Sequence, residues 1–158
     1  MEKDKLTIEL VPKSSWGNNL RHFLPRHEWD SLRKSIYESY DNKCGICDDY
    51  GGVLHCHEKW EYDDENKIQT LVRLIALCEL CHHVKHIGHA EILAQRSNFD
   101  FEKVILHFTK VNGCTRDHFW KVEDEAFDIW AERSVCDWTV CFGEYSSLVS
   151  SFVGVKKG

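Results

Sequence analysis

Four cysteines are spaced as ligands of a single metal ion. They form two Cys-x2-Cys pairs, Cys44 with Cys47 and Cys78 with Cys81, separated by residues 48–77. A Cys-x2-Cys pair on a tight turn directs two thiolates at one point, and Gly45 permits such a turn. Two pairs supply the four soft ligands of a closed tetrahedral zinc site. The cysteine quartet therefore predicts a structural Zn²⁺ that joins the two ends of this segment.

Histidines close to the quartet form a second group of potential ligands. On a helix that begins near Cys78, His82 and His86 lie four residues apart on one face, about 5–6 Å apart at their Cβ atoms. This spacing suits two imidazoles that bind one divalent ion, and His89 lies near the same face. The pattern predicts a reactive metal site separate from the structural one.

The segment around His57 is expected to approach this helix, because the quartet holds the two segments together. In an extended chain His55 and His57 point to one side, and Cys56 and Glu58 point to the other. Either pair can therefore face the helix. A neutral imidazole beside a bound cation is a suitable general base for activating water. The ion would polarise a phosphoryl oxygen and stabilise the leaving alkoxide.

The spacing of apolar residues predicts the elements that position these side chains. Residues 6–11 alternate between apolar and polar, which predicts a short strand. Apolar residues at helical spacing predict a helix over residues 27–41. Residues 53–57 are predicted to be extended, and the charged residues 61–66 are predicted to form an acidic loop.

The second half of the chain is predicted to be mostly helical. The apolar residues 71–77 lead into Cys78, and a helix is predicted from there through about residue 87, ending near Gly88. Alternation over residues 138–142 predicts a last short strand. Three more helices are predicted, over residues 89–97, 100–112 and 115–133.

Composition restricts the class of protein. The 158 residues include 20 basic and 26 acidic side chains, a net charge of −6, which excludes a basic protein that coats nucleic acid. No apolar run approaches the roughly 20 residues that span a bilayer, and the charged start leads into no apolar signal segment. We therefore expect a cytoplasmic protein without a membrane partner, in which the cysteines are reduced thiols or metal ligands.

Aromatic residues offer a further possibility. Six tryptophans can be interpreted as surfaces on which nucleobases stack. Their spacing beside other apolar residues favours core positions instead. They are Trp16, Trp29, Trp60, Trp120, Trp130 and Trp138.

With these motifs in this order, the chain resembles the HNH endonuclease family, in particular members whose ββα-metal motif carries a four-cysteine zinc. The wider chain is similar to small uncharacterised bacterial and phage HNH proteins in "IELVP", a Trp followed by "NLR", "CHEKWEYDD", "VKHIG", "KVNG" and a late "RS" before a Trp. The motifs that carry the resemblance are Cys44-x2-Cys47, Leu54-His55-Cys56-His57-Glu58, and Leu77-Cys78-Glu79-Leu80-Cys81-His82-His83-Val84-Lys85-His86.

The resemblance implies roles for individual histidines. In the family a β-hairpin carries the first His and a helix carries the last. By motif position, His57 would be the general base, His82 a metal ligand and His86 a second one. The chain departs from the family at Cys56, where Asp or His is usual, and a thiolate prefers zinc to magnesium.

A second departure concerns the Asn that orients the base in the family. Arg73 is nearest to that position, and Asn66 and Gln69 are the nearest amides. Because of the departure at Cys56, three residues remain as the ligand that completes the metal site of His82 and His86: His55, Cys56 or Glu58. The cofactors expected are a structural Zn²⁺ and a second divalent ion, Mg²⁺, Mn²⁺, Ni²⁺ or Zn²⁺.

The fold expected is a single α+β domain over residues 1–158, built on a ββα-metal motif. Residues 1–43 would hold a strand and a helix, residues 44–89 the motif, and residues 90–158 a helical extension. The function expected is metal-dependent hydrolysis of phosphodiester bonds in nucleic acid, with DNA preferred over RNA. The alternative is a catalytically impaired zinc-binding module that binds protein or nucleic acid.

A phosphate substrate must be held by cations. Basic residues gather modestly before the motif, and Lys85 lies on the expected metal helix. The net charge of residues 44–90, with 4 basic and 8 acidic residues, is −4, so we expect weak and salt-sensitive binding. A protein partner or a second copy of the chain would supply further affinity. The expected contacts are Lys85, Arg21, Arg26, Arg33 and Lys34.

Overall fold

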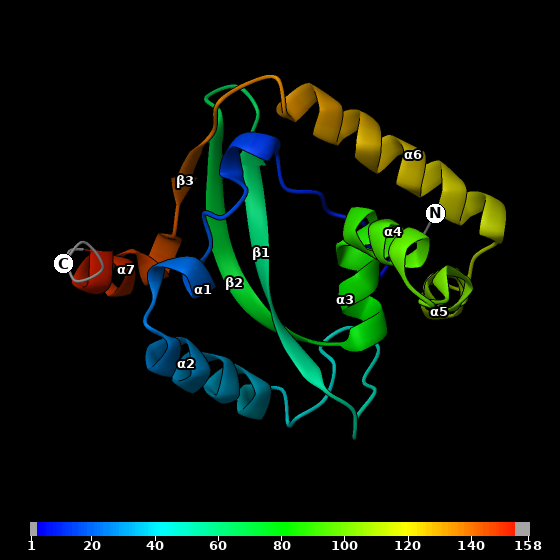
Figure 1. Ribbon diagram of the computed structural model, residues 1–158, viewed down its shortest axis with the longest axis horizontal. Helices are drawn as coiled ribbons and strands as arrows, with labels where there is room; N and C mark the ends of the chain where they lie inside the picture. Colours follow the sequence, from blue (N-terminus) through cyan, green and yellow to red (C-terminus); the bar gives the residue numbers. More distant parts are fainter. Residues whose placement is uncertain (1–2, 154–158) are drawn as a thin grey trace.

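The computed structural model describes residues 3–153, in which helices pack on both sides of a three-stranded sheet (Figure 1). Two long antiparallel strands dominate the sheet, β1 (Leu54–Asp63) and β2 (Ile68–Cys78). The short strand β3 (Thr139–Cys141) pairs in parallel with β2. The strand order β1-β2-β3 leaves β1 at an edge of the sheet. The prediction of a mixed α+β fold is confirmed.

The β-hairpin is longer than predicted, because β1 runs through the first half of the segment expected to be an acidic loop. Residues of β1 up to Asp63 have partners in β2. The hairpin then turns at Asp63, whose Oδ1 accepts the backbone N–H groups of Glu65 and Asn66 at 3.1 and 3.0 Å. Charged side chains are common on edge strands, where they face solvent. Charge alone was therefore a poor indicator of a loop.

The N-terminal segment over residues 6–11 is not a strand, contrary to the prediction. Its alternation is nonetheless reflected in burial, since Leu6 and Ile8 lie in the core. The backbone of Leu6 is satisfied by a side chain in place of a strand. Leu6 N–H donates to Asn112 Oδ1, and Asn112 Nδ2 donates to the Leu6 carbonyl, both at 2.8 Å. The Asn112 amide thus makes the two hydrogen bonds with the Leu6 backbone that a neighbouring strand would otherwise make.

The helix after Cys78 ends earlier than predicted. α3 (Glu79–Lys85) stops at His86, whose φ of −108° and ψ of 52° are not helical. A new helix, α4 (Ile87–Arg96), begins at once, and Gly88 lies inside it. The chain therefore changes direction at His86, two residues before the predicted end near Gly88, and the helix predicted over residues 89–97 begins at Ile87.

The other long helices lie close to their predicted positions: α2 (Arg26–Ser39), α5 (Phe101–Asn112) and α6 (Arg116–Arg133). Four shorter elements were not predicted, since they are too short to show a period: η1 (Lys13–Ser15), α1 (Leu20–Phe23), η2 (Gly143–Tyr145) and α7 (Ser146–Val153). No helix within residues 3–153 has the length and apolar character that crossing a membrane requires.

Two apolar clusters hold the hairpin from opposite sides (Figure 1). One cluster connects the cysteine quartet with α3, α5 and α6, and Ile75 and Leu77 of β2 belong to it. The other connects α1, α2 and α7, and it contains Leu71 and Leu74 of β2. Because β2 contributes to both clusters, its position is fixed from both sides.

We predict that Asn112→Ala lowers the free energy of unfolding by about 1–3 kcal/mol, because the N–H and carbonyl of buried Leu6 lose their partners. Denaturant unfolding measures this change. Lys110→Ala, an exposed position on the same helix, is the control and should be nearly neutral. Equal stability of both variants would contradict the proposed role of Asn112.

Candidate metal centres

The four cysteines of the quartet meet at the base of the hairpin. Their Sγ atoms all lie within 4.8 Å of one another, and Cys47 Sγ is 3.6 Å from Cys78 Sγ. Cys44, Cys78 and Cys81 are buried, and all four are free thiols. The quartet can therefore hold a structural metal ion such as zinc.

Local structure explains how the turn approaches β2 so closely. A Cβ at Gly45 would lie 2.7 Å from the Tyr40 ring and 2.9 Å from Ile75 Cγ2, so only glycine fits. Gly45 N–H donates to the Ala76 carbonyl at 2.7 Å. Its φ is not positive, so close packing, and not the turn geometry we expected, requires this glycine. At the other pair, Cys78 caps α3, and its Sγ accepts the Cys81 N–H at 3.4 Å.

Crowding of the thiols favours a cation at their centre. The hydrogen bonds from Cys78 and Cys81 lower the pKa of Cys44 well below its usual range. Hydrogen bonds with Cys44 and Cys78, together with burial, raise the pKa of Cys81 far above the usual range of a thiol. Thiols this close together cannot all lose their protons unless a cation offsets the repulsion between the thiolates. A divalent ion removes this conflict, because it stabilises several thiolates together.

His107 of α5 also touches the quartet, with its Nε2 3.1 Å from Cys81 Sγ. A ring N–H in this position can donate to a thiolate, as the outer partners of metal ligands commonly do. Sequence reasoning missed His107, since it has no ligand spacing to the cysteines. Only the packing of α5 on α3 brings it there.

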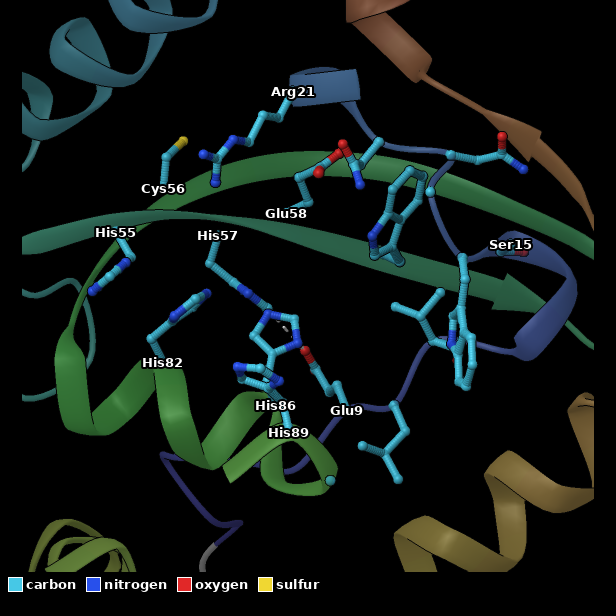
Figure 2. Close-up of a pocket in the computed structure, with 18 of the residues that line it drawn as sticks. Glu9, Ser15, Arg21, His55, Cys56, His57, Glu58, His82, His86 and His89 are labelled. Carbon is cyan, nitrogen blue, oxygen red and sulfur yellow. Dashed lines mark hydrogen bonds and ion pairs between the residues drawn. The ribbon is translucent and has the colours of Figure 1, made fainter. Parts of the chain in front are cut away.

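A second group of ligands comes from β1 and α3. One ring nitrogen from each of His57, His82 and His86 lies within 4.8 Å of the others. The ring centroid of His57 is 6.0 Å from that of His82 and 5.2 Å from that of His86 (Figure 2). The ring centroids of His82 and His86 are 4.6 Å apart. The two imidazoles thus lie on one side of the helix, as their spacing of four residues predicted. We call these three residues the imidazole cluster.

Strand alternation separates the residues around His57. His55 lies on the side of α3, where its ring stacks on His82 at 4.6 Å between centroids. Cys56 and Glu58 point away from the imidazole cluster (Figure 2). Cys56 packs in the apolar cluster of α1 and α2, and Glu58 Oε2 accepts the Leu20 N–H at 3.3 Å. The structure thus brings His55, and neither Cys56 nor Glu58, to the imidazoles.

Burial keeps the imidazole cluster neutral. Desolvation lowers the pKa of His57, and the nearby Glu9 carboxylate offsets only part of this effect. Burial, followed by the neighbouring histidines, lowers the pKa of His82 to about 2. Burial and the same kind of repulsion lower the pKa of His86 to about 4. Neutral imidazole is the form that binds metal ions and accepts protons.

The donor set of the cluster fits a divalent transition metal. Both ring nitrogens of His57 are buried without a hydrogen-bond partner among residues 3–153. Such buried polar atoms are costly, and a bound cation with its water would satisfy them. Imidazole suits zinc, nickel and related ions better than it suits magnesium.

Glu9 is a site residue that sequence reasoning missed. Its Oε2 lies 3.9 Å from His57 Nε2. This distance is too long for a direct hydrogen bond, but it is short enough for the Glu9 carboxylate to favour the protonated form of His57. Lys59 donates to Glu9 Oε1 at 3.1 Å, and Lys85 lies 3.4 Å from Oε2. Burial alone would raise the pKa of Glu9, yet His57 and the two lysines hold it far below its usual value. The available signal was the charged position between the apolar residues Ile8 and Leu10.

Only some of the residues expected to contact the substrate lie where a substrate could reach them together. Lys85 is only 4% exposed and donates to Thr7 Oγ1 at 2.7 Å, so it lies inside the protein, away from a substrate. Arg21, Arg26 and Arg33 line a groove of about 1290 Å³ that follows β1 and also contains the imidazole cluster. Lys34 is exposed on α2 but does not line this groove.

The amides considered for the orienting role lie elsewhere. Asn66 belongs to the hairpin turn, where its Nδ2 donates to Asp63 at 2.9 Å. Gln69 pairs with Tyr62, far along the strands from the pairing of His57 with Ile75. Arg73 pairs with Lys59 and is exposed. Glu9 occupies the place beside His57 instead.

No family model, no curated protein and no solved structure matches this chain. The two groups of candidate ligands and the groove are therefore the features of the molecule that bear on its function.

We predict that Cys44→Ser removes about one zinc per chain and lowers the melting temperature, because three thiolates hold the ion less tightly than four. Elemental analysis of reduced protein and thermal unfolding measure the two effects. Cys141→Ser, at an exposed thiol outside the quartet, should change neither. Absence of zinc from the unmutated protein, or its retention in Cys44→Ser, would refute the site.

Proposed function

We propose that the protein is a metal-dependent nuclease of the HNH type that hydrolyses phosphodiester bonds, with DNA as the preferred substrate. The observation that carries the proposal is the meeting of His57, His82 and His86 on a β-hairpin and the helix that follows it. A purely structural zinc domain has no need of a second ligand group in a groove. The order of strand, strand and helix, with the quartet at its base, agrees with a ββα-metal motif.

Each member of the cluster has a distinct role in this proposal. His82 and His86 hold the divalent ion, Mg²⁺, Mn²⁺, Ni²⁺ or Zn²⁺, and His55 supports His82 by stacking. A bound ion would polarise a phosphoryl oxygen and stabilise the leaving alkoxide. His57 accepts the proton of the attacking water, because burial keeps it neutral and thus able to act as a base.

Glu9 is the positioning residue for His57 in this mechanism. When His57 takes up a proton, the imidazolium lies 3.9 Å from the Glu9 carboxylate, which stabilises the new charge. Lys59 and Lys85 keep Glu9 ionised and fix where its oxygens lie. A carboxylate that orients a histidine base is a recurring arrangement in catalysis.

Local charge allows an acidic chain to accept a polyanion. Glu9 is paired with two lysines, so this group carries one net positive charge. Asp30 lies between Arg26 and Arg33 at 3.9 and 2.9 Å, which gives the same balance at α2. Burial raises the pKa of Glu58 to about 7, which reduces its negative charge near neutrality. The groove is therefore less acidic than the total of −6 suggests.

The second candidate is the zinc-binding module without catalysis. One observation favours it, namely that His57 itself lies at ligand distance from the other two imidazoles. If all three histidines hold an ion, no member of the imidazole cluster remains free as the base. Metal content of the His57 variant distinguishes the two candidates.

We predict that His57→Ala abolishes plasmid cleavage but retains the second metal ion, whereas His82→Ala loses both. The reason is that His57 acts as a base and His82 as a ligand. Cleavage assays with Mg²⁺, Mn²⁺, Ni²⁺, Co²⁺ or Zn²⁺ and elemental analysis measure the two properties. His118→Ala, which lies outside the groove, is the control.

Two results would contradict this assignment. Equal cleavage by the wild type, His57→Ala and His82→Ala would reveal a contaminating nuclease. Loss of the second metal from His57→Ala, together with an inactive wild type, would favour the non-catalytic module.

We predict that Arg21→Ala weakens DNA binding and reduces the slope of log K against log [salt] by about 1, because one phosphate contact is lost. Among residues 3–153 Arg21 forms no ion pair, and it lines the groove. Binding titrations at several salt concentrations measure the slope. Lys34→Ala should leave it unchanged, since Lys34 does not line the groove. Identical slopes for the wild type and Arg21→Ala would argue against substrate in this groove.

A further inference from the structure

Trp16 is not a core residue, in contrast to our expectation for the six tryptophans. Its side chain is 61% exposed and lines the groove that contains the imidazole cluster. Its ring stacks on Trp130 with 6.3 Å between centroids and 19° between planes. One face is thus turned toward Trp130, while more than half of the residue stays exposed at the groove.

The orientation of this ring is fixed from within the protein. Trp16 Nε1 donates to the Val11 carbonyl at 2.8 Å, and Trp130 Nε1 donates to the same oxygen at 3.1 Å. The only polar atom of the Trp16 side chain is therefore engaged. What the residue offers to a ligand is its π surface, held in a set plane.

Two polar side chains beside this part of the groove lack partners. The Gln69 amide is fully buried and lines the groove, and neither its oxygen nor its nitrogen has a hydrogen-bond partner among residues 3–153. Ser15, next to Trp16 in the chain, has an unpartnered buried hydroxyl and lines the same groove. Buried polar groups of this kind are rare and costly unless a ligand or water satisfies them.

The fold holds these residues at one end of the sheet. Ser14 Oγ accepts the Trp138 N–H at 3.1 Å, which fixes η1 beside the start of β3. β3 in turn pairs Val140 with Gln69, whose other neighbour is Tyr62 near the end of β1. Tyr62 is five positions after His57 along β1, a distance of about 16 Å at the rise of a strand. A ligand can therefore extend along β1 from one end to the other.

From these contacts we infer that this end of the groove is a nucleobase subsite, in which an unpaired base of single-stranded nucleic acid stacks on Trp16 and hydrogen-bonds to Gln69. The inference rests on the proposed function, because it defines the substrate of the same groove. An aromatic face binds any base, whereas an amide that donates and accepts at once suits the polar edge of a base. A base paired inside a duplex exposes neither its face nor its pairing edge.

Charge favours nucleic acid over a protein partner as the occupant. Arg21 and the net positive group around Asp30 line the same groove, and the charge of Glu9, which also lines it, is offset by Lys59 and Lys85. A single strand needs cations for its phosphates and an aromatic surface for its bases, and both line one groove. The binding experiment described next also tests the alternative that Trp16 contacts a protein partner.

The experiment measures binding by the full chain carrying His57→Ala, so that the probe is not cut. The probes are a labelled single strand of deoxyadenosine, an abasic strand of equal length, and the corresponding duplex. Trp16→Ala is expected to weaken binding of the single strand by about 5- to 100-fold, the loss of one stacked base. Binding of the abasic strand, which has the same phosphates and no bases, should not change.

Two further variants complete the design. Trp120→Ala is the matched control, since Trp120 is also exposed, at 41%, but does not line the groove. Gln69→Met keeps the size of the side chain and removes its unpartnered amide. We expect it to raise stability toward denaturant while weakening binding of the single strand, a combination that a purely structural role would not produce.

The inference is overturned if Trp16→Ala leaves binding of the single strand unchanged, as it would if Trp16 served a protein partner. It is also overturned if the abasic strand or the duplex loses affinity to the same extent. Cleavage of the labelled single strand and of plasmid by the wild type reports separately on the proposed function. Base-dependent binding without cleavage would refute the nuclease alone, and cleavage without an effect of Trp16→Ala on binding would refute the subsite alone.

Discussion

The close approach of four thiols at the base of the hairpin is the constraint on which the rest of the site depends. Gly45 has no room for a Cβ against Tyr40 and Ile75, so the first cysteine pair lies directly on β2. Cys78 ends β2 and caps α3, so the second pair ties the helix to the same point. A divalent ion would stabilise the thiolates together and lock strand and helix in one geometry.

The imidazole cluster follows from that junction. The register of the hairpin places His57 opposite Ile75, three residues before the end of β2, and α3 returns past it with His82 and His86. The break at His86 then turns α4 away and leaves its imidazole at the end of α3. We propose catalysis at this point because neutral imidazoles, the partly buried carboxylate of Glu9 and an open groove lie together there.

The net charge of the whole chain is a poor guide to the charge at the groove. The chain as a whole carries −6, yet two of the carboxylates that line the groove, Glu9 and Asp30, each lie between two cations. Pairing within the fold, and not composition, sets the field that a substrate meets. In the same way Lys85, expected at the surface, is buried as part of the support for Glu9.

Local spacing in the sequence was enough to predict the cysteine quartet, the pairing of His82 with His86, the opposite directions of His57 and Cys56, and most of the long helices. These features depend on residues at most a few positions apart, or on the periods of helix and strand. The contacts of Glu9 with His57, of His107 with Cys81 and of Asn112 with Leu6 join residues far apart in the chain, and no period encodes them. Whether Trp16 lies in the core or in the groove likewise depended on where distant Trp130 packs. The sequence by itself thus determined the candidate ligands, and only the tertiary structure decided what surrounds them, because burial and charge pairing arise between segments that meet after folding.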